Sequence, residues 1–375
     1  MTVFRSAHHR DTHTLIHLSA LKQNWDAIVA RIPKGSRILP VVKANGYGHG
    51  TLTIARECAR LGAVGMGVAE VGEALSLRYS GYAEEVLCFG EFSAETVIRA
   101  GGVDVTFVLH SKEEIPEVIP AIRRLSVPAR IHLEIETGMH RLGIEPDDWR
   151  DVALRLRSLP EIRVEGIFSH FSESEAADLS FSEHQQSELE RAATLFEEIL
   201  GHRLIRHVAN SGGVLNLPAS RLDWVRPGLL LYGYAPGQIL PAGEFRPVLE
   251  WRAPIIQIKK IRKGDRVGYG SVFCAPQDMT IGTVAVGYGD GYRRGFVSAG
   301  VGYRGKRRKI VGSVCMDLLM VDLSDLADPR RGDDIVLMGD GSQGEPTAAE
   351  LASAEGSLAY QVLTGISARV GREAV

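Results

Sequence analysis

The sequence predicts an α/β protein in which an N-terminal (β/α)8 barrel is followed by a C-terminal mostly-β domain. Three observations carry this prediction. Eight short apolar runs alternate with helix-like segments up to about residue 233, the pattern changes at residues 235–247, and the remaining chain is rich in β-branched residues and tight turns. Parallel strands that are covered on both faces are nearly continuous in apolar residues, as these eight runs are.

The barrel prediction rests on the order of the runs. In chain order they are RILPVVK, AVGMGVAE, EVLCFGE, VDVTFVLH, ARIHLEIE, VEGIFSH, IRHVAN and DWVRPGLLLYG. Most gaps hold segments with apolar residues three and four apart, such as TLTIARECARL, DDWRDVALRLRSL and SELERAATLFEEIL, and this spacing predicts helices. The gap after IRHVAN is short and shows little helical periodicity. Eight such units match the strand count of a (β/α)8 barrel, with a doubly wound open sheet as the alternative.

The second domain follows the segment APGQILPAGEFRP, residues 235–247. Its strands are predicted in APIIQIKKIRKGDRVGYG, MTIGTVAVGYGDGY, KIVGSVCMDLLMVDL and RRGDDIVLMGDG, which are separated by KGD, YGD and RGD turns. A short helix pair is predicted in TAAELASAEGSLAYQVLTGI. We therefore expect two domains, residues 1–240 and residues 241–375.

Composition excludes several classes of partner. The formal net charge is −3, which does not favour nucleic acid or an anionic membrane as the main partner, and no apolar run approaches the roughly 18 residues of a membrane span. The N-terminus lacks the pattern of a secretory signal, so we expect a cytoplasmic protein. The four cysteines have neither metal-like nor disulfide-like spacing and fit a reducing compartment; they are Cys58, Cys88, Cys274 and Cys315. We predict no metal site.

Polar residues at the ends of the barrel strands are the candidates for a site, because the loops after the strands build it. They are Lys43, Glu70, His110, Glu136, His170, Asn210, Ser211 and Arg226. For Glu70 and His110 an ordinary polar strand end is the preferred interpretation, and for Arg226 taken alone a structural ion pair. Lys43 stands out because it follows ILPVV directly and precedes ANGYGHG, whose glycines can take positive φ or let the backbone approach a ligand. A lysine partly withdrawn from water is a plausible Schiff-base nucleophile, and a solvated loop lysine is the alternative.

The segment VVKANGYGHG resembles the signature of alanine racemases, in which the lysine holds pyridoxal phosphate (PLP) covalently. The likeness returns along nearly the whole chain, in ETGMHRLG, HVANSGG, VRPGLLLYG, VGYGSVF, VGYGDGY and VCMD. The expected layout, a barrel and then a β-domain, also resembles the family fold. The resemblance implies a PLP-dependent isomerase that interconverts L- and D-alanine and supplies D-alanine for peptidoglycan.

Racemisation removes the Cα proton from one face and returns a proton to the other, so two groups on opposite sides are needed. The resemblance assigns Lys43 to the D-enantiomer and Tyr269 to the L-enantiomer. Unperturbed lysine and tyrosine pKa values lie near roughly 10, so the surroundings must lower each pKa. His170 resembles the family residue that contacts the tyrosine and the cofactor. Tyr269 belongs to the β-domain and in this family comes from the partner subunit, which implies a head-to-tail homodimer with shared sites.

The resemblance also implies the cofactor contacts. Tyr47, Ser211 and the backbone at Gly228 and Leu229 match the phosphate contacts, with Asn210 beside them. Small polar groups and backbone N–H groups after a strand suit a phosphate.

Arg226 matches the arginine that faces the pyridine nitrogen, and His207 the residue that supports it. Because an arginine keeps its proton, it should leave that nitrogen largely unprotonated and favour reprotonation at Cα over transamination. Arg141 resembles the arginine near the substrate carboxylate. A planar carboxylate suits the donor fork of a guanidinium group. Met316 matches a second substrate contact offered by the partner, and Tyr288 resembles part of the narrow entrance.

The sequence departs from the family pattern at three positions. Glu134 stands where many members carry a carbamylated lysine that faces the arginine, and a glutamate supplies an anion without that modification. His140 stands where glycine is common. Ala368 falls where some members place a tyrosine that touches the phosphate and narrows the pocket, so its absence could admit a larger side chain.

Three alternatives to an alanine racemase remain open at this stage. The first is a racemase of the same fold that acts on another amino acid, with serine the obvious candidate given Ala368. The second is a carboxylyase of the same fold type, although VGYGSVF fits the racemase signature better. The third is a non-catalytic PLP carrier, against which the roughly 130-residue β-domain with Tyr269 and Met316 argues.

Overall fold

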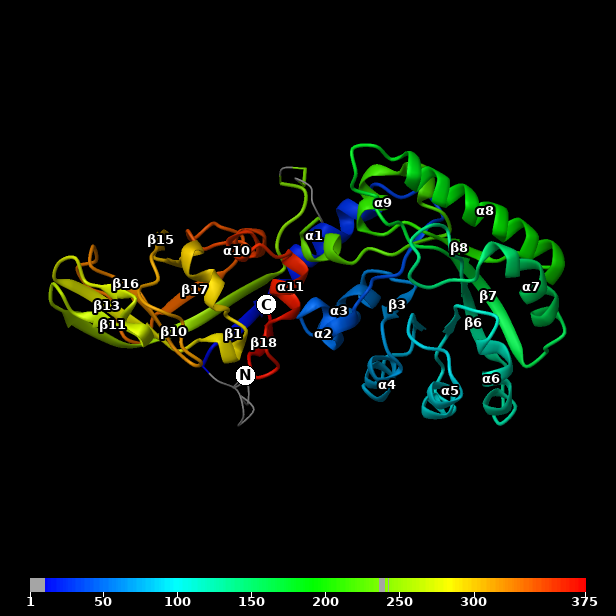
Figure 1. Cartoon of the computed structure of the whole chain (residues 1–375), viewed down its shortest axis with the longest axis horizontal. Coiled ribbons are helices and arrows are strands. Elements are labelled where there is room, and N and C mark those ends of the chain that lie inside the picture. The colour runs from blue at the N-terminus through cyan, green and yellow to red at the C-terminus, as the bar shows by residue number, and fades with distance from the viewer. Residues whose placement is uncertain (1–10, 236–239, 242) are drawn as a thin grey trace.

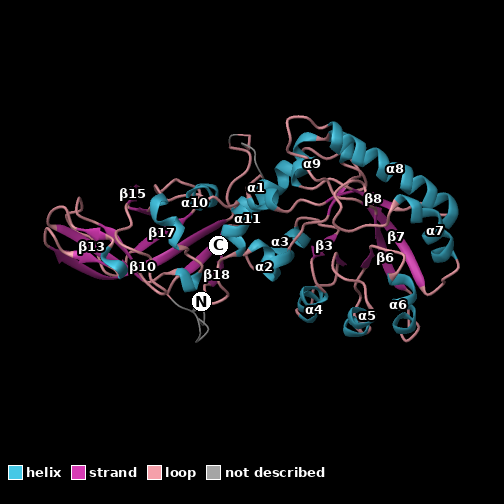
Figure 2. Cartoon of the chain, in the orientation of Figure 1, coloured by secondary structure: helices cyan, strands magenta, loops and turns pink. Residues whose placement is uncertain are grey.

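The computed structural model describes residues 11–235, 240–241 and 243–375. The molecule is elongated, with a helix-covered barrel at one end and a strand-rich domain at the other (Figures 1 and 2). Part of the segment 235–247, where the sequence pattern changes, lies outside the described residues. Among the described residues, no helix combines the length and the apolar character that a bilayer crossing would need.

Eight parallel strands form the barrel, as predicted. They are β2 (Arg37–Ile38), β3 (Gly65–Val68), β4 (Glu85–Cys88), β5 (Phe107–Leu109), β6 (Ala129–Glu134), β7 (Ile162–Phe168), β8 (Ile205–His207) and β9 (Trp224–Val225). Six of them form one sheet in the order β2-β9-β8-β7-β6-β5, and β3 pairs with β4. Parallel bridges between Val41 and Gly67 and between Leu87 and Thr106 close the ring. The closed ring excludes the doubly wound open sheet.

Helices fill the gaps between the strands and cover the barrel (Figure 1). They are α2 (Lys43–Tyr47), α3 (Thr51–Arg60), α4 (Val71–Tyr79), α5 (Ala94–Ala100), α6 (Glu114–Ile122), α7 (Trp149–Arg157), α8 (Ser180–Leu200) and α9 (Ser211–Asn216), and α1 (Leu18–Val29) precedes the first barrel strand. The amphipathic spacing explains them: α3 buries Ile54, Ala55 and Cys58, which lie on one helical face. A capping box between Ser93 and Thr96 starts α5.

The run DWVRPGLLLYG is a strand only at β9. Residues Leu229–Tyr232 form the 3-10 helix η3 instead. The carbonyl oxygen of Pro227 still accepts from the backbone N–H of Val41 at 3.0 Å, but Pro227 has no N–H to donate to a neighbouring strand, so the regular pairing does not continue through it. The prediction of a strand over the whole run was wrong there, and the early turn places Gly228 and Leu229 at the end of the barrel where the site lies.

The C-terminal part is built on one eight-stranded sheet. Its strands are β1 (His13–Ile16), β10 (Leu249–Ile261), β13 (Met279–Val284), β14 (Val301–Tyr303), β15 (Lys306–Arg308), β16 (Leu319–Asp322), β17 (Asp334–Met338) and β18 (Gly371–Ala374). The pairings are antiparallel except that β1 and β18 run parallel, so the two ends of the described chain lie side by side. The predicted helix pair is α10 (Ala348–Glu355) and α11 (Ala359–Thr364). A separate short ladder joins β11 (Arg266–Val267) to β12 (Phe273–Cys274).

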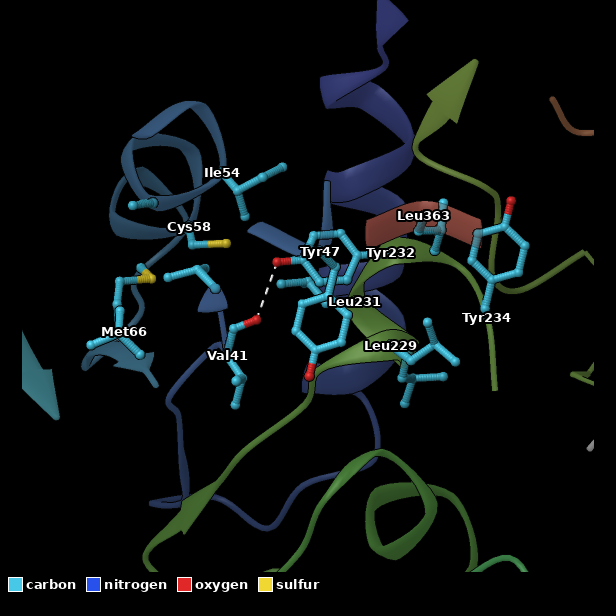
Figure 3. Close-up of a cluster of buried hydrophobic side chains, with 14 of the residues drawn as sticks. Val41, Tyr47, Ile54, Cys58, Met66, Leu229, Leu231, Tyr232, Tyr234 and Leu363 are labelled. Atoms are coloured by element: carbon cyan, nitrogen blue, oxygen red, sulfur yellow. Dashed lines mark hydrogen bonds between the residues drawn. The ribbon is translucent and has the colours of Figure 1, made fainter. Parts of the chain in front are cut away.

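A buried cluster connects the Lys43 loop to the rest of the molecule (Figure 3). The hydroxyl of Tyr232 donates a hydrogen bond to the carbonyl oxygen of Val41 at 3.1 Å. The rings of Tyr47 and Tyr232 lie 5.0 Å apart, and Leu363 of α11 belongs to the same cluster. The loop that carries Lys43 is therefore held from the barrel side and from the C-terminal side.

Candidate active site

A cavity of about 630 Å³ opens at the carboxyl ends of the barrel strands. Its lining includes ten of the fourteen residues to which the sequence analysis gave a role: Lys43, Tyr47, Glu134, Arg141, His170, Asn210, Ser211, Arg226, Gly228 and Leu229. The barrel therefore brings together side chains that are spread over nearly 190 positions of the sequence. Of the other four, His207 lies behind the cavity wall, and Tyr269, Tyr288 and Met316 lie on the C-terminal domain.

Lys43 is presented by an unusual turn of the backbone. It follows the buried Val42, and the next four residues, 44–47, all take positive φ between 51° and 60°. Glycines also take positive φ at positions 46, 48 and 50, as predicted. The ring of His49 holds the turn, because its Nδ1–H donates to the carbonyl oxygens of Gly46 (3.1 Å) and Tyr47 (2.9 Å).

The charge state of Lys43 follows from its surroundings. Withdrawal from bulk water within the cavity, and then the charge of Arg141, lower the pKa of Lys43, whereas the carboxylate of Glu73 opposes them. The expectation of a lowered lysine pKa is confirmed. A lowered pKa increases the fraction of neutral amine, which is the form that acts as a base or a nucleophile.

Arg226 is buried and fixed by a directional chain of hydrogen bonds. One Nη donates to His207 Nδ1 at 2.7 Å, and the other donates to the carbonyl oxygen of Ser169 at 2.7 Å. Because a guanidinium cannot accept, His207 carries its proton on Nε2 and donates it to His132 Nδ1, 2.8 Å away. Burial, followed by the charge of Arg226, lowers the pKa of His207 well below its ordinary value.

Two features follow from this chain. Burial lowers the pKa of Arg226 itself to about 10, which still leaves it protonated at neutral pH. His132 was not predicted as a site residue. Its pKa falls to about 3, first through burial and then through Arg130 and Arg226, so it stays neutral and can only accept from His207. The one available signal was a histidine among the polar residues that alternate with apolar ones in the run ARIHLEIE.

Glu134 is part of a second buried chain. It is 5% exposed, and its Oε2 lies 3.4 Å from His110 Nε2. His110 Nδ1 lies 3.3 Å from Glu114. Burial works to lower the pKa of His110, but Glu114 and Glu134 outweigh it and raise that pKa. Burial raises the pKa of Glu134, against the opposing charges of His110 and Arg141.

His170 lies beside Arg226 at the cavity wall, with Nδ1 3.4 Å from the guanidinium. Burial and then the charges of Arg226, Arg141 and Lys43 lower the pKa of His170 well below its ordinary value. A neutral imidazole in this position can accept or donate one hydrogen bond without adding charge to the cavity.

Small polar groups gather at another part of the wall. Ser211 Oγ accepts from the backbone N–H groups of Gly228 and Leu230, both at 3.1 Å. Asn210 caps α9 by accepting from the backbone N–H of Gly213 at 3.0 Å. A Cβ added at Gly228 would lie 2.6 Å from the hydroxyl of Tyr47, so only glycine allows these groups to come so close.

The remaining predicted residues do not join this cavity. Tyr269 begins η4 (Tyr269–Ser271), just after β11. Strand β11 lies at the end of the molecule farthest from the barrel (Figure 1). Tyr269, Met316 and Tyr288 are exposed by 75%, 54% and 46%. The segment 313–317 includes Met316 and is hydrogen-bonded to the other two residues. Ser313 Oγ donates to the carbonyl oxygen of Tyr269 at 3.2 Å, and the backbone N–H of Tyr288 donates to the carbonyl oxygen of Cys315 at 3.0 Å.

One sequence expectation is wrong. Ala368 is exposed and does not line the cavity, whereas Tyr360 of α11 does, with its ring 5.9 Å from that of Tyr47. Burial, and then Glu175, raise the pKa of Tyr360 to about 12. The cavity therefore does contain a tyrosine ring from the C-terminal domain. Sequence reasoning missed it because a tyrosine in a short helix beside Val362 and Leu363 resembles an ordinary core residue.

His140 takes φ +51°. A positive φ favours glycine, and a non-glycine residue there costs on the order of 1–2 kcal/mol.

The barrel, its lysine-bearing cavity and the appended β-domain define a two-domain (β/α)8-barrel enzyme. The family model described as "Alanine racemase, N-terminal domain" matches residues 16–236, and "Alanine racemase, C-terminal domain" matches residues 248–374. The chain belongs to the alanine racemase family.

Relatives and solved structures agree with this. The chain is 36% identical to an alanine racemase of Geobacter sulfurreducens over 375 residues, covering 97% of both chains, and 35% identical to one of Thermobifida fusca, covering 95% and 96%. It is similar in structure to an alanine racemase of Clostridium difficile 630, with a TM-score of 0.91 and 29% identity over 96% of this chain and 94% of that one. An alanine racemase of a D-cycloserine-producing Streptomyces lavendulae has a TM-score of 0.91 and 31% identity, covering 99% and 98%.

Proposed function

We propose that this chain is an alanine racemase that interconverts L-alanine and D-alanine, and so supplies D-alanine for peptidoglycan. The family membership supports the reaction type. One observation in the molecule carries the proposal: Lys43, whose pKa is lowered, shares a single cavity with the fixed cation Arg226 and with Arg141. A base for the proton and fixed cations for the negative charge are groups that promote proton transfer at an amino-acid Cα.

The residues of the cavity fit PLP as the cofactor. Lys43 is the amine that would hold its aldehyde carbon, and Arg226 is the fixed cation that would face the ring nitrogen. The hydroxyls of Tyr47 and Ser211, with the backbone at Gly228, suit the phosphate. When bound, PLP supplies an electron sink for the pair of electrons left at the substrate Cα.

The barrel residues have definable tasks in this scheme. Arg141 would bind the substrate carboxylate, and Lys43, as a neutral amine, would exchange a proton with one face of Cα. Arg226 keeps its proton because His207 and Ser169 accept its N–H groups, so it delivers no proton to the cofactor ring. That arrangement favours return of the proton to Cα.

The second base has to come from another copy of the chain. Tyr269, Met316 and Tyr288 are exposed on the C-terminal domain and lie outside the cavity of their own chain. We infer a head-to-tail homodimer in which Tyr269, Met316 and Tyr288 of each subunit reach the cavity at the barrel of the other. His170, neutral at the cavity wall, would meet the partner's tyrosine.

Alanine is the proposed substrate. Serine was considered because Ala368 seemed to replace a cavity tyrosine. The ring of Tyr360 lines the cavity, so no tyrosine is missing there. A cavity that a tyrosine ring narrows suits a small side chain.

Replacement of Tyr269 by phenylalanine tests the proposal against a non-catalytic carrier. The variant should lose at least about a hundredfold in racemisation in both directions, as loss of a general acid–base group does. Exchange of the D-alanine Cα proton in deuterated water should persist, because Lys43 is intact. Tyr79→Phe is the matched control, since Tyr79 is 78% exposed on α4, away from the cavity. Racemisation that survives in Tyr269→Phe would contradict the two-base scheme.

A further inference from the structure

We propose that Arg369 is a positioning residue that holds Tyr288 and Met316 in place for the partner's cavity. The inference rests on the proposed function, because it requires that the two side chains act in a shared site. It adds a residue that touches neither substrate nor cofactor but organises the surface that does.

Arg369 bridges two carboxylates, each next to one of these side chains. Its Nε donates to Asp290 Oδ1 at 2.8 Å, and one Nη donates to Asp317 Oδ1 at 2.8 Å. Asp290 lies two residues after Tyr288, and Asp317 directly follows Met316. Asp290 is fully buried, so its charge is compensated inside the protein. A planar guanidinium with several donors can hold two carboxylates at once, which a point charge does less well.

The two segments that Arg369 bridges are already stacked on each other. The backbone N–H of Gly289 donates to the carbonyl oxygen of Met316 at 2.8 Å. A Cβ at Gly289 would lie 2.5 Å from the guanidinium of Arg369, so the arginine occupies the space that glycine leaves. A Cβ at Gly287 would overlap the carbonyl oxygens of Cys315 and Met316. The arginine is therefore packed into the pair of loops rather than lying over them.

Arg369 also lies close to a helix that serves the chain's own cavity. The backbone N–H of Ser367 donates to the carbonyl oxygen of Asp290 at 2.9 Å, and the segment leads back to α11, which carries Tyr360. An arginine in this position could act on its own cavity through α11 or on the partner's through Tyr288 and Met316. Its two ion pairs are with Asp290 and Asp317, which lie beside Tyr288 and Met316, and they favour action on the partner's cavity.

Single variants give the first test. Arg369→Gln should raise the KM for alanine roughly tenfold, with a smaller change in kcat, because loss of charge-assisted hydrogen bonds loosens the substrate-facing loops. Arg369→Lys, which keeps the charge but not the fork, should fall between. Arg304→Gln is the matched control, since Arg304 lies in the same domain, is 39% exposed and pairs with Asp333 at 3.0 Å. An unchanged KM in both Arg369 variants, or an equal rise in Arg304→Gln, would overturn the inference.

Subunit mixing decides where Arg369 acts. A Lys43→Ala subunit is inactive in its own cavity but carries an intact C-terminal domain. When it is mixed with Arg369→Gln subunits, each hybrid dimer should have one working cavity, and that cavity should have the wild-type KM. Random pairing makes half of the dimers hybrids, so these cavities should give about a quarter of the wild-type rate. Activity with the raised KM alone, and no component with the wild-type KM from the hybrid dimers, would mean that Arg369 acts on its own cavity, and would overturn the inference.

The mixing experiment contains its own control for the proposed function. Lys43→Ala mixed with Tyr269→Phe should also regain activity, because each supplies what the other lacks. If this pair stays inactive, the shared-site dimer itself fails. If this pair recovers and the Arg369→Gln pair does not, only the role of Arg369 is refuted. Thermal unfolding and gel filtration of Arg369→Lys separate both results from misfolding, because the conservative variant keeps the buried charge of Asp290 paired.

Discussion

Replacing His49 by asparagine should flatten the pH dependence of the protein's stability below pH 7. The ring of His49 is fully buried and lies 4.4 Å from that of Tyr232. Its Nδ1–H donates to the carbonyl oxygens of Gly46 and Tyr47, and its Nε2 has no hydrogen-bond partner among the described residues. A proton on Nε2 would therefore place a charge in the core without an acceptor, next to the turn that presents Lys43.

The size of the effect follows from the pKa. Burial, opposed by the two backbone hydrogen bonds, lowers the pKa of His49 to about 4, whereas an unfolded histidine titrates near roughly 6.5. Between these values the unfolded chain binds a proton that the folded chain does not. The free energy of unfolding therefore falls as the pH drops below about 6.5, and from pH 8 to pH 5 this histidine alone removes about 2 kcal/mol.

Urea unfolding of the apoprotein at pH 8 and pH 5 measures this. His49→Asn keeps an N–H donor for the two carbonyl groups but cannot take up a proton, so its loss of stability on acidification should be about 2 kcal/mol smaller than that of the wild type. His184→Asn, at an exposed position of α8, serves as the control for removing a histidine. Parallel pH profiles for the wild type and His49→Asn would refute the reasoning.

Two further predictions concern the surroundings of the cavity. Gly48→Ala should lower the free energy of unfolding, measured by urea denaturation, by at least about 2 kcal/mol more than Gly62→Ala does. Both glycines have positive φ, but only at Gly48 would an added Cβ overlap backbone atoms, those of Leu363 in α11. Equal losses would show that strain alone matters. Glu134→Gln should lower the pKa of His110 in an NMR titration, because it removes one of the two carboxylates that raise it; a pKa that stays constant or rises would contradict the Glu134–His110 pairing.

The sequence predicted the barrel well because its strands are buried on both faces and therefore read as apolar runs. It predicted the strand-rich domain from turn pairs and β-branched residues. It did not predict that β1 would pair with β10 and β18, because nothing in four residues near the N-terminus indicates partners more than 230 positions away. The end of β9 was misplaced although Pro227, which has no N–H, marks it.

The residues of the site also fall into those that the sequence predicted and those that it did not. Lys43 and Arg226 were noted as polar residues at the ends of apolar strands, and the resemblance to alanine racemases then assigned their roles. His132 was missed because its role lies in a hydrogen bond to His207, a residue 75 positions away. Ala368 was mistaken for the position of a cavity tyrosine, because a count along the chain does not tell which turn after α11 faces inward. The left-handed turn after Lys43 was expected only at its glycines, yet Ala44, Asn45 and Tyr47 also adopt it.

The central claim is that this chain moves the Cα proton of alanine between two faces. The direct measurement is to incubate the purified protein with PLP and one L-amino acid at a time in deuterated water, and to follow Cα exchange by NMR and chirality by chromatography. We expect alanine to exchange and racemise faster than serine and larger amino acids, with deuterium at Cα of the D-alanine formed. No exchange with any amino acid, or a clear preference for serine or a larger side chain, would contradict it.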